Sequence, residues 1–259
     1  MILRRLTQSL KEQNWTAIVI EFILLVSGVF LGIQVSNWNA DRETRQKSAV
    51  FTERLRYDLR AEAYGYRYLV AYNKEVLRSA VRTLDDLSGE APLSDEQFVI
   101  SAYRSTQYVF NDRFRTTYDE LVSTGDVRLI ADPEVRQAAT TVFNSQVFDG
   151  IVKAGRDSEY RRLFRTSISH EIQHALLEHC GDRYFALFHE PLVDVLDYPC
   201  TLDAPADKIH AAASALRGNR QLAAALQLRF ADIDTSLTDL QVNNQALFQG
   251  LMKVAGDKP

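Results

Sequence analysis

The residues with the clearest potential for chemistry form the string His170-Glu171-Ile172-Gln173-His174. This string has the form H-E-x-x-H, in which two histidines one helical turn apart bind zinc and the glutamate acts as base on the metal-bound water. A zinc peptidase with His170, Glu171 and His174 at its centre is therefore the enzyme alternative. The P-loop, the dinucleotide-binding glycine pattern and the nucleophile elbow are absent from the sequence.

The surroundings of the string favour a plain helix surface. The apolar residues of this segment form one helical stripe: Tyr160, Phe164, Ile168, Ile172 and Leu176. Both histidines should then point away from the core, where a metal would lack the dry cavity that catalysis needs. His179 is expected on the core side, and Glu190 is a third-ligand candidate that follows the string closely. We expect a solvated helix face without a bound metal or cofactor.

The chain contains two cysteines, Cys180 and Cys200, separated by a stretch with glycine and proline. A pair in this setting predicts a disulfide that closes a loop, and the alternative is two unrelated buried thiols. A disulfide would place this part of the chain in an oxidising compartment such as the bacterial periplasm.

The segment that organises the chain is the apolar run 16–38, flanked by Trp15 and Trp38. The run is about as long as the roughly 20 residues that cross a bilayer as a helix, and the tryptophans occupy interfacial positions. We expect a cytoplasmic amphipathic segment over 1–15, a transmembrane helix over 16–38 and a periplasmic helical domain over 39–259.

The orientation follows from basic residues and from the cysteines. Arg4, Arg5 and Lys11 precede the run and favour a cytoplasmic N-terminus. Basic residues also follow the run, but a long domain translocates largely regardless of its charge. No small-residue cleavage site follows the run, so it should remain as an anchor in the bacterial inner membrane.

One face of the apolar run carries residues suited to helix association: Ala17, Glu21, Gly28 and Gly32. Gly28 and Gly32 form a G-x-x-x-G pair, which lets two helix backbones approach closely. A carboxyl group within an apolar run is costly and is a functional hypothesis by default. The alternative is that Glu21 reaches the nearer headgroups and the glycines are incidental.

The remaining pattern predicts an all-α protein in which the membrane helix continues into a bundle of long antiparallel helices. The membrane helix should continue to about Leu87 and end at a turn over 88–92. The following elements are expected to be a helix opened by the capping box Ser94–Gln97, a helix over 114–123, a helix from Pro133 to about His179 with breaks near Gly150 and Gly155, an irregular stretch over 182–204, and helices over 205–216 and 219–254.

Two stretches resemble a widespread family of uncharacterised bacterial single-pass membrane proteins. IEFILLVSGVFLGIQVSNWNADR (20–42) has an early glutamate, a central glycine and a Gln-x-x-Asn-Trp-Asn exit. TYDELVSTGDVRLIADPEVRQAATTVFNS (117–145) resembles the family's second recurrent segment. The resemblance implies a membrane-anchored helical protein and supplies no activity.

The charge balance limits the partners. The formal net charge is −4, from 34 acidic and 30 basic residues, which argues against nucleic acid as a partner because such binding needs a clustered basic face. We expect a non-catalytic membrane protein that acts in assembly or scaffolding, or as an accessory subunit. Its partners would be the lipid bilayer and either a membrane protein or a second copy of itself. A periplasmic ligand sensor is a further alternative, weakened by the short cytoplasmic part.

Overall fold

The computed structural model of the chain describes residues 15–110, 113–183, 188, 196 and 198–256. The expected amphipathic segment over 1–15 lies outside the described residues, apart from Trp15. The protein is all-α, as predicted, and the described residues contain no β-strand.

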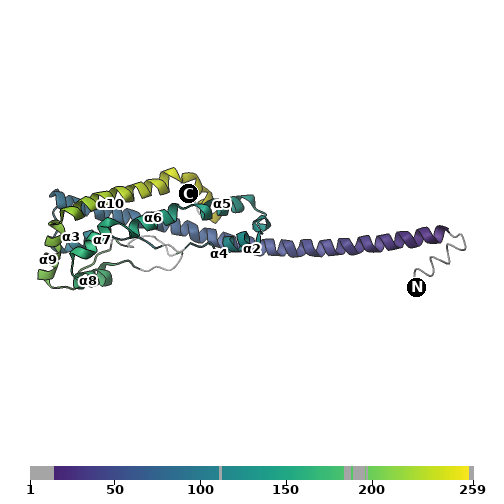
Figure 1. Cartoon of the computed structure of the whole chain (residues 1–259), viewed down its shortest axis with the longest axis horizontal. Helices are drawn as coiled ribbons and strands as arrows, with labels where there is room; N and C mark the ends of the chain where they lie inside the picture. Colours follow the sequence, from purple (N-terminus) through teal and green to yellow (C-terminus); the bar gives the residue numbers. More distant parts are fainter. Residues whose placement is uncertain (1–14, 111–112, 184–187, 189–195, 197, 257–259) are drawn as a thin grey trace.

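The architecture is built on one helix, α2, which spans Trp15–Ser88 (Figure 1). Its 74 residues extend over roughly 110 Å at 1.5 Å per residue. The helix is uninterrupted because no proline occurs before Pro92. Its N-terminal half projects from the rest of the molecule, and its first buried residue is Leu55.

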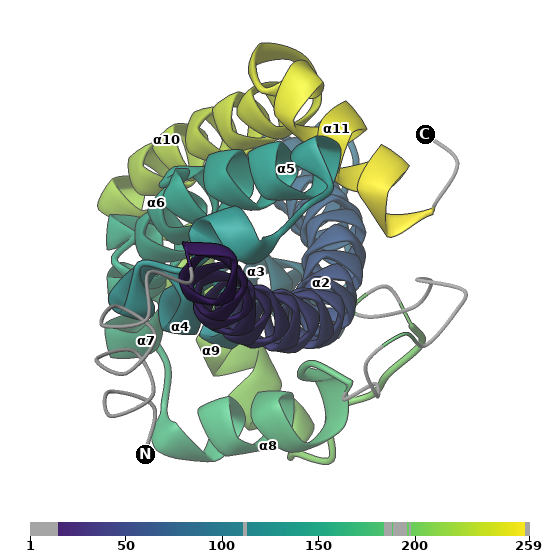
Figure 2. The ribbon, with the colours of Figure 1, turned by 90° about the vertical axis from the view of Figure 1, so that its right-hand side faces the viewer.

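The other elements lie around the C-terminal half of α2 (Figure 2). They are α3 (Asp95–Ser105), α4 (Thr116–Thr124), the 3₁₀ turn η1 (Val127–Leu129), α5 (Pro133–Asn144), α6 (Val147–Arg156), α7 (Glu159–Ser167), α8 (His170–Cys180), α9 (Ala206–Arg217), α10 (Arg220–Thr238), the π-helical turn η2 (Asp239–Asn243) and α11 (Gln245–Ala255). Of these, α3, α4, η1, α5, α10 and α11 pack on α2 directly.

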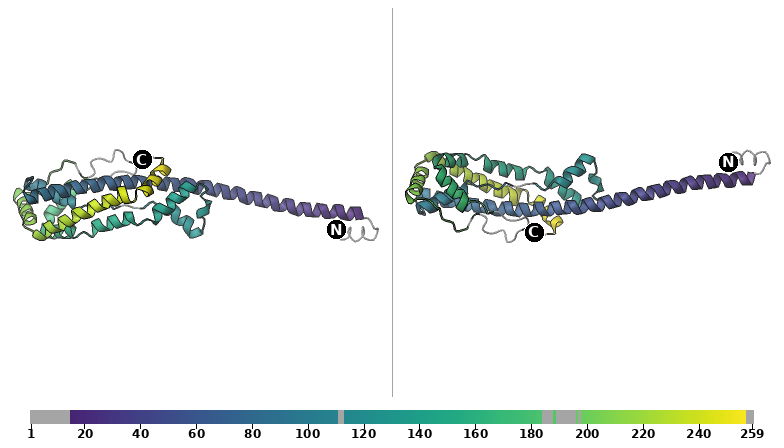
Figure 3. Two further views of the ribbon diagram at one scale, coloured as in Figure 1. Left: turned by 90° about the horizontal axis from the view of Figure 1, so that it is seen from above. Right: turned by 90° about the horizontal axis from the view of Figure 1, so that it is seen from below.

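These elements form a distal end and a near end, where near means closest to the projecting half of α2. At the distal end α3 turns back along α2, and α9 crosses beside it. From there α10, η2 and α11 return along α2 towards the near end (Figure 3). The segment α4–η1–α5 covers the near end and contacts both α2 and α11.

Local sequence signals explain most of the boundaries. Ser94 and Gln97 form the predicted capping box at the start of α3. Gly125 ends α4 with φ of 74°, a left-handed conformation in which glycine has no side chain to clash. Asp132 caps α5, and Pro133 occupies a first-turn position where the missing N–H is not needed.

Two large hydrophobic cores hold the domain on α2. The distal core joins α3, α7, α8 and α9, and includes Phe98, Tyr160 and Leu176. The near core joins α2 to α4, α5 and α11, and includes Leu59 and Phe248. The C-terminal half of α2 is therefore held against the other helices by the burial of apolar surface.

The segment 133–179 is more broken than the sequence pattern suggested. It forms four helices, α5 to α8, rather than one long helix with breaks at its glycines. The break between α7 and α8 falls at Ile168 and Ser169, where Ser169 caps α8. Likewise, the π-helical turn η2 interrupts the helix expected over 219–254.

Candidate functional site

The projecting half of α2 is the first candidate site. It is the one helix among the described residues long and apolar enough to cross a membrane, and none of its apolar window is buried within the protein. A Cβ atom added at Gly28 or at Gly32 would meet nothing within 4 Å. A neighbouring helix could therefore approach this backbone directly.

Ala17 and Glu21 lie on the same face as the two glycines. At 100° per residue, the four positions fall within roughly 60° of the helix circumference. Glu21 is half-buried, and its Oε2 atom has no hydrogen-bond partner among the described residues. The structure thus keeps the predicted face together on one unbroken helix. Contact with another helix stays a prediction.

The near end of the domain is tied to α2 just after this apolar half. The Ser48 hydroxyl donates a hydrogen bond to the carbonyl oxygen of Leu129. Arg54 pairs with Glu120 at 2.7 Å, and Arg56 pairs with Asp132 at 3.2 Å. The two stretches that carry the family resemblance, 20–42 and 117–145, are therefore neighbours along α2, because the second contacts α2 directly beyond the end of the first.

A buried ion pair links α2 to the residues that directly precede α4. Arg113 Nε lies 2.9 Å from Glu62 Oε2, and the two side chains are 8% and 0% exposed. The backbone N–H of Phe114 donates to Glu62 at 2.6 Å, and Arg113 donates to the carbonyl of Val142 at 3.0 Å. Burial raises the pKa of Glu62, and the charge of Arg113 opposes that rise. Arg113 also lies over the ring of Phe148.

The structure forms the predicted disulfide between Cys180 and Cys200, whose Cα atoms are 5.5 Å apart. Hydrogen bonds hold the same region against α2 and α3. Tyr72 of α2 donates to Asp182 at 2.8 Å, and Arg104 of α3 donates to the carbonyl of Tyr198 at 2.7 Å. The disulfide thus joins the end of α8 to a segment that α2 and α3 already bind.

The H-E-x-x-H string occupies the first turns of α8. Its two histidines are exposed, as the apolar stripe predicted. Glu171 forms an ion pair with Lys208 of α9, and His174 Nδ1 lies 3.4 Å from Glu178. The expected base and one expected ligand are therefore engaged with other side chains.

The third ligand of the proposed zinc site is also missing from the described part of the chain. His179 is exposed. At 100° per residue it lies on the same side of α8 as the buried Ile172, Ala175 and Leu176, so its exposure comes from its place in the last turn of the helix. Glu190 lies outside the described residues, which contain no group of three potential metal ligands.

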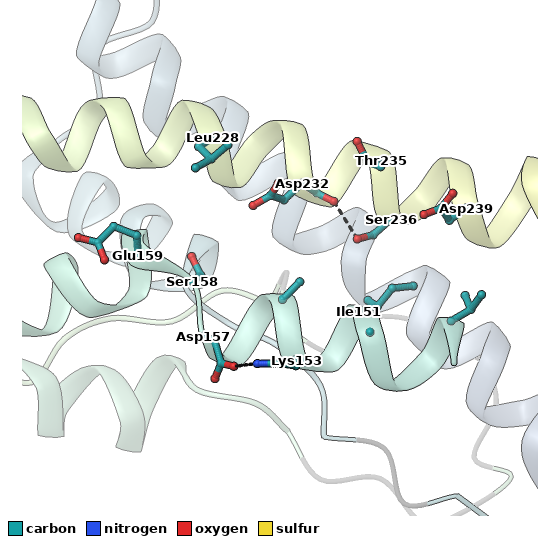
Figure 4. A pocket seen from close by; sticks show the side chains of 13 residues that line it. Ile151, Lys153, Asp157, Ser158, Glu159, Leu228, Asp232, Thr235, Ser236 and Asp239 are labelled. Carbon is teal, nitrogen blue, oxygen red and sulfur yellow. Dashed lines mark hydrogen bonds and ion pairs between the residues drawn. The ribbon is translucent and has the colours of Figure 1, made fainter. Parts of the chain in front are cut away.

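A groove lies between α6 and α10 (Figure 4). It has a volume of about 670 Å³. Carboxylates from the α6–α7 turn, the start of α7, α10 and η2 surround it: Asp157, Glu159, Asp232 and Asp239. Among the described residues, Lys153 is the one lysine or arginine lining the groove, and it pairs with Asp157. The walls also include Ile151 and the exposed Leu228. The groove is suited to cationic groups with an apolar surface.

Sequence reasoning missed the Glu62–Arg113 pair and the groove. The position of Glu62 in the sequence could have indicated a buried charge, because Leu59 and Ala63, which flank it on α2, are both buried. A charge on the buried face of a helix indicates a partner, but the partner is 51 residues away and precedes α4. The groove had no such signal, because it depends on how α6 and α10 diverge.

Together the fold and the sites define a class of protein: an all-α domain packed on one long helix, α2. The N-terminal half of α2 is apolar, is not covered by the domain and is long enough to span a membrane. The chain belongs to a family of unknown function, DUF6090, which matches residues 21–169. The match includes the apolar helix and the segment α4–η1–α5, and it ends directly before α8. Neither the curated proteins nor the solved structures include a significant match.

Proposed function

We propose that this protein is a single-pass membrane protein that acts without catalysis, in assembly or as an accessory subunit of a membrane complex. The bare apolar half of α2 carries this proposal. Its apolar window has no residue buried within the chain, so its apolar surface requires lipid or another protein. The helix would span a bacterial inner membrane, with the N-terminus in the cytoplasm and the domain in the periplasm.

The contact surface would be the face formed by Ala17, Glu21, Gly28 and Gly32. Its occupant is a helix of a partner membrane protein or of a second copy. Close backbone approach at the glycines adds dispersion contacts with little loss of side-chain freedom. Hydrogen bonds between membrane helices average only about 0.6 kcal/mol, so the glycines should contribute more than Glu21.

A matched pair of substitutions tests this surface. Gly28→Ile places a branched side chain on the proposed face, whereas Val29→Ile makes a small change on a different face of the same turn. Cross-linking in native membranes and native mass spectrometry in mild detergent would measure association. Loss of the complex with Gly28→Ile alone is expected. Equal effects of the two changes, or no effect of either, would refute the proposed face.

The peptidase alternative gains no support from the geometry. Glu171 is paired with Lys208, and His174 lies beside Glu178. A catalytic zinc site needs three protein ligands around an open coordination position. We therefore prefer the non-catalytic role.

A further inference from the structure

A cavity of about 260 Å³ lies between α3, α7 and α8, beneath the histidines of the H-E-x-x-H string. This volume equals roughly nine water molecules at about 30 Å³ each. Tyr103, Phe164 and Leu177 supply apolar wall. Phe164 is fully buried, and Leu177 is 68% exposed, so the cavity has a fixed inner end and an open outer rim.

Among the described residues, the polar side chains that line the cavity include cationic and protonatable groups but no carboxylate. Arg165, His170 and His174 all line it. Within the described part of the chain, the Arg165 guanidinium has no hydrogen-bond partner. Gln173 donates to the backbone carbonyls of Arg165 at 2.8 Å and Ile168 at 3.2 Å. This amide bridge fixes α8, with its two histidines, relative to the arginine on α7.

The nearby carboxylates are turned to other partners. Glu171 pairs with Lys208 of α9, and Asp182 accepts the Tyr72 hydroxyl. Glu178 lies 3.4 Å from His174 Nδ1 and is therefore engaged with that histidine. His170 has no comparable contact among the described residues.

Tyr103, on α3, adds a neutral hydroxyl to the wall. Burial raises its pKa to about 12, so the phenol keeps its proton near neutral pH. The cavity therefore presents a fixed positive charge and proton donors to whatever enters it. An anion is favoured over a metal cation at such a site.

We propose that this cavity binds a small carboxylate with an apolar body. Arg165 would hold the carboxylate through paired N–H donors, a geometry that guanidinium groups provide. His170 would add a second donor, and the apolar body would contact Phe164 and Leu177. This inference is independent of the assembly role, because the cavity lies at the distal end of the domain and needs no contact with a membrane.

The test compares benzoate with benzamide, a neutral molecule of nearly the same shape. Full-length protein in lipid nanodiscs is titrated by calorimetry, and empty nanodiscs are the blank. Benzoate should bind at least about tenfold more tightly than benzamide, since a hydrogen bond to a charged carboxylate is stronger than one to a neutral amide.

Matched variants identify the residues responsible. Arg165→Gln should weaken benzoate binding about tenfold or more, whereas Arg162→Gln, on the same helix but paired with Glu159, should not. His170→Ala should weaken benzoate binding several-fold, whereas His210→Ala, at an exposed histidine bonded to Asp95, should not. Thermal unfolding of each variant checks that it folds. Equal binding of benzoate and benzamide, or equal effects of Arg165→Gln and Arg162→Gln, would overturn the proposal.

Discussion

The buried pair Glu62–Arg113 gives the sharpest test of how the domain is attached to α2. Replacing Arg113 by methionine keeps most of the apolar stem but leaves the Glu62 carboxylate, which is 0% exposed, without its cation. Breaking a buried pair in this way costs about 3–5 kcal/mol of the free energy of unfolding. Arg54→Met is the matched control, because its pair with Glu120 joins α2 to α4 with both side chains 43% exposed. That change should cost less than about 1 kcal/mol.

The pH dependence separates the electrostatic part of this cost from lost packing. Arg113→Met also removes the bond to Val142 and the contact with the Phe148 ring, worth about 1 kcal/mol each at any pH. The folded-state pKa of Glu62 is already raised by burial, and without Arg113 it should rise further. A raised carboxyl pKa gives stability that is complete below the unfolded value, about 4.3, and is lost as the pH rises through the folded value. The deficit of the variant should therefore shrink to roughly 2 kcal/mol in acid.

Urea unfolding of full-length protein in detergent, followed by far-ultraviolet circular dichroism, measures these free energies. The double variant Glu62→Gln/Arg113→Met should recover much of the loss near neutral pH, because it leaves no buried charge. A deficit that does not change with pH, or a double variant no more stable than Arg113→Met, would contradict this account of the pair.

Three further predictions concern the disulfide, the H-E-x-x-H string and the helix ends. Cys180→Ser should lower the free energy of unfolding by about 3 kcal/mol, and non-reduced peptide mapping of the parent protein should find Cys180 and Cys200 linked. Purified protein should contain no stoichiometric zinc by elemental analysis, and His174→Ala should leave its metal content unchanged; stoichiometric zinc lost in that variant would instead support the peptidase. Gly125→Ala should destabilise by about 1 kcal/mol, because φ there is 74°, whereas Gly150→Ala, within α6, should stabilise by up to about 1 kcal/mol; urea midpoints that shift in the same direction for both would contradict this.

Features decided by neighbouring residues were predictable from the sequence. The apolar run, its continuation to the end of α2 at Ser88, and the caps at Ser94, Gly125 and Asp132 all follow from local propensity and turn chemistry. The disulfide was also predicted, because the chain offers only one possible pair of cysteines. In each case, competing arrangements of the same residues are few.

Features decided by tertiary packing were not predictable in the same way. The stripe from Tyr160 to Leu176 suggested one continuous helix, yet the chain breaks at Ser169 and all five stripe residues are still buried. Two short helices can bury the same side chains against α3 and α9. The cavity beneath His170 and His174 depends on that break, so helical periodicity alone could not reveal it.

The continuity of α2 has a geometric consequence for the proposed membrane complex. No proline interrupts the helix between Trp38 and Ser48, where the domain first bonds to α2, a separation of roughly 15 Å at 1.5 Å per residue. The rotational phase between the Gly28–Gly32 face and the acidic groove is therefore set by residue count. Inserting one residue into this stretch would turn the domain by about 100°, whereas seven would restore its bearing to within about 20°. In the proposed complex, the length of this stretch would set both the distance of the domain from the bilayer and the direction in which the acidic groove faces.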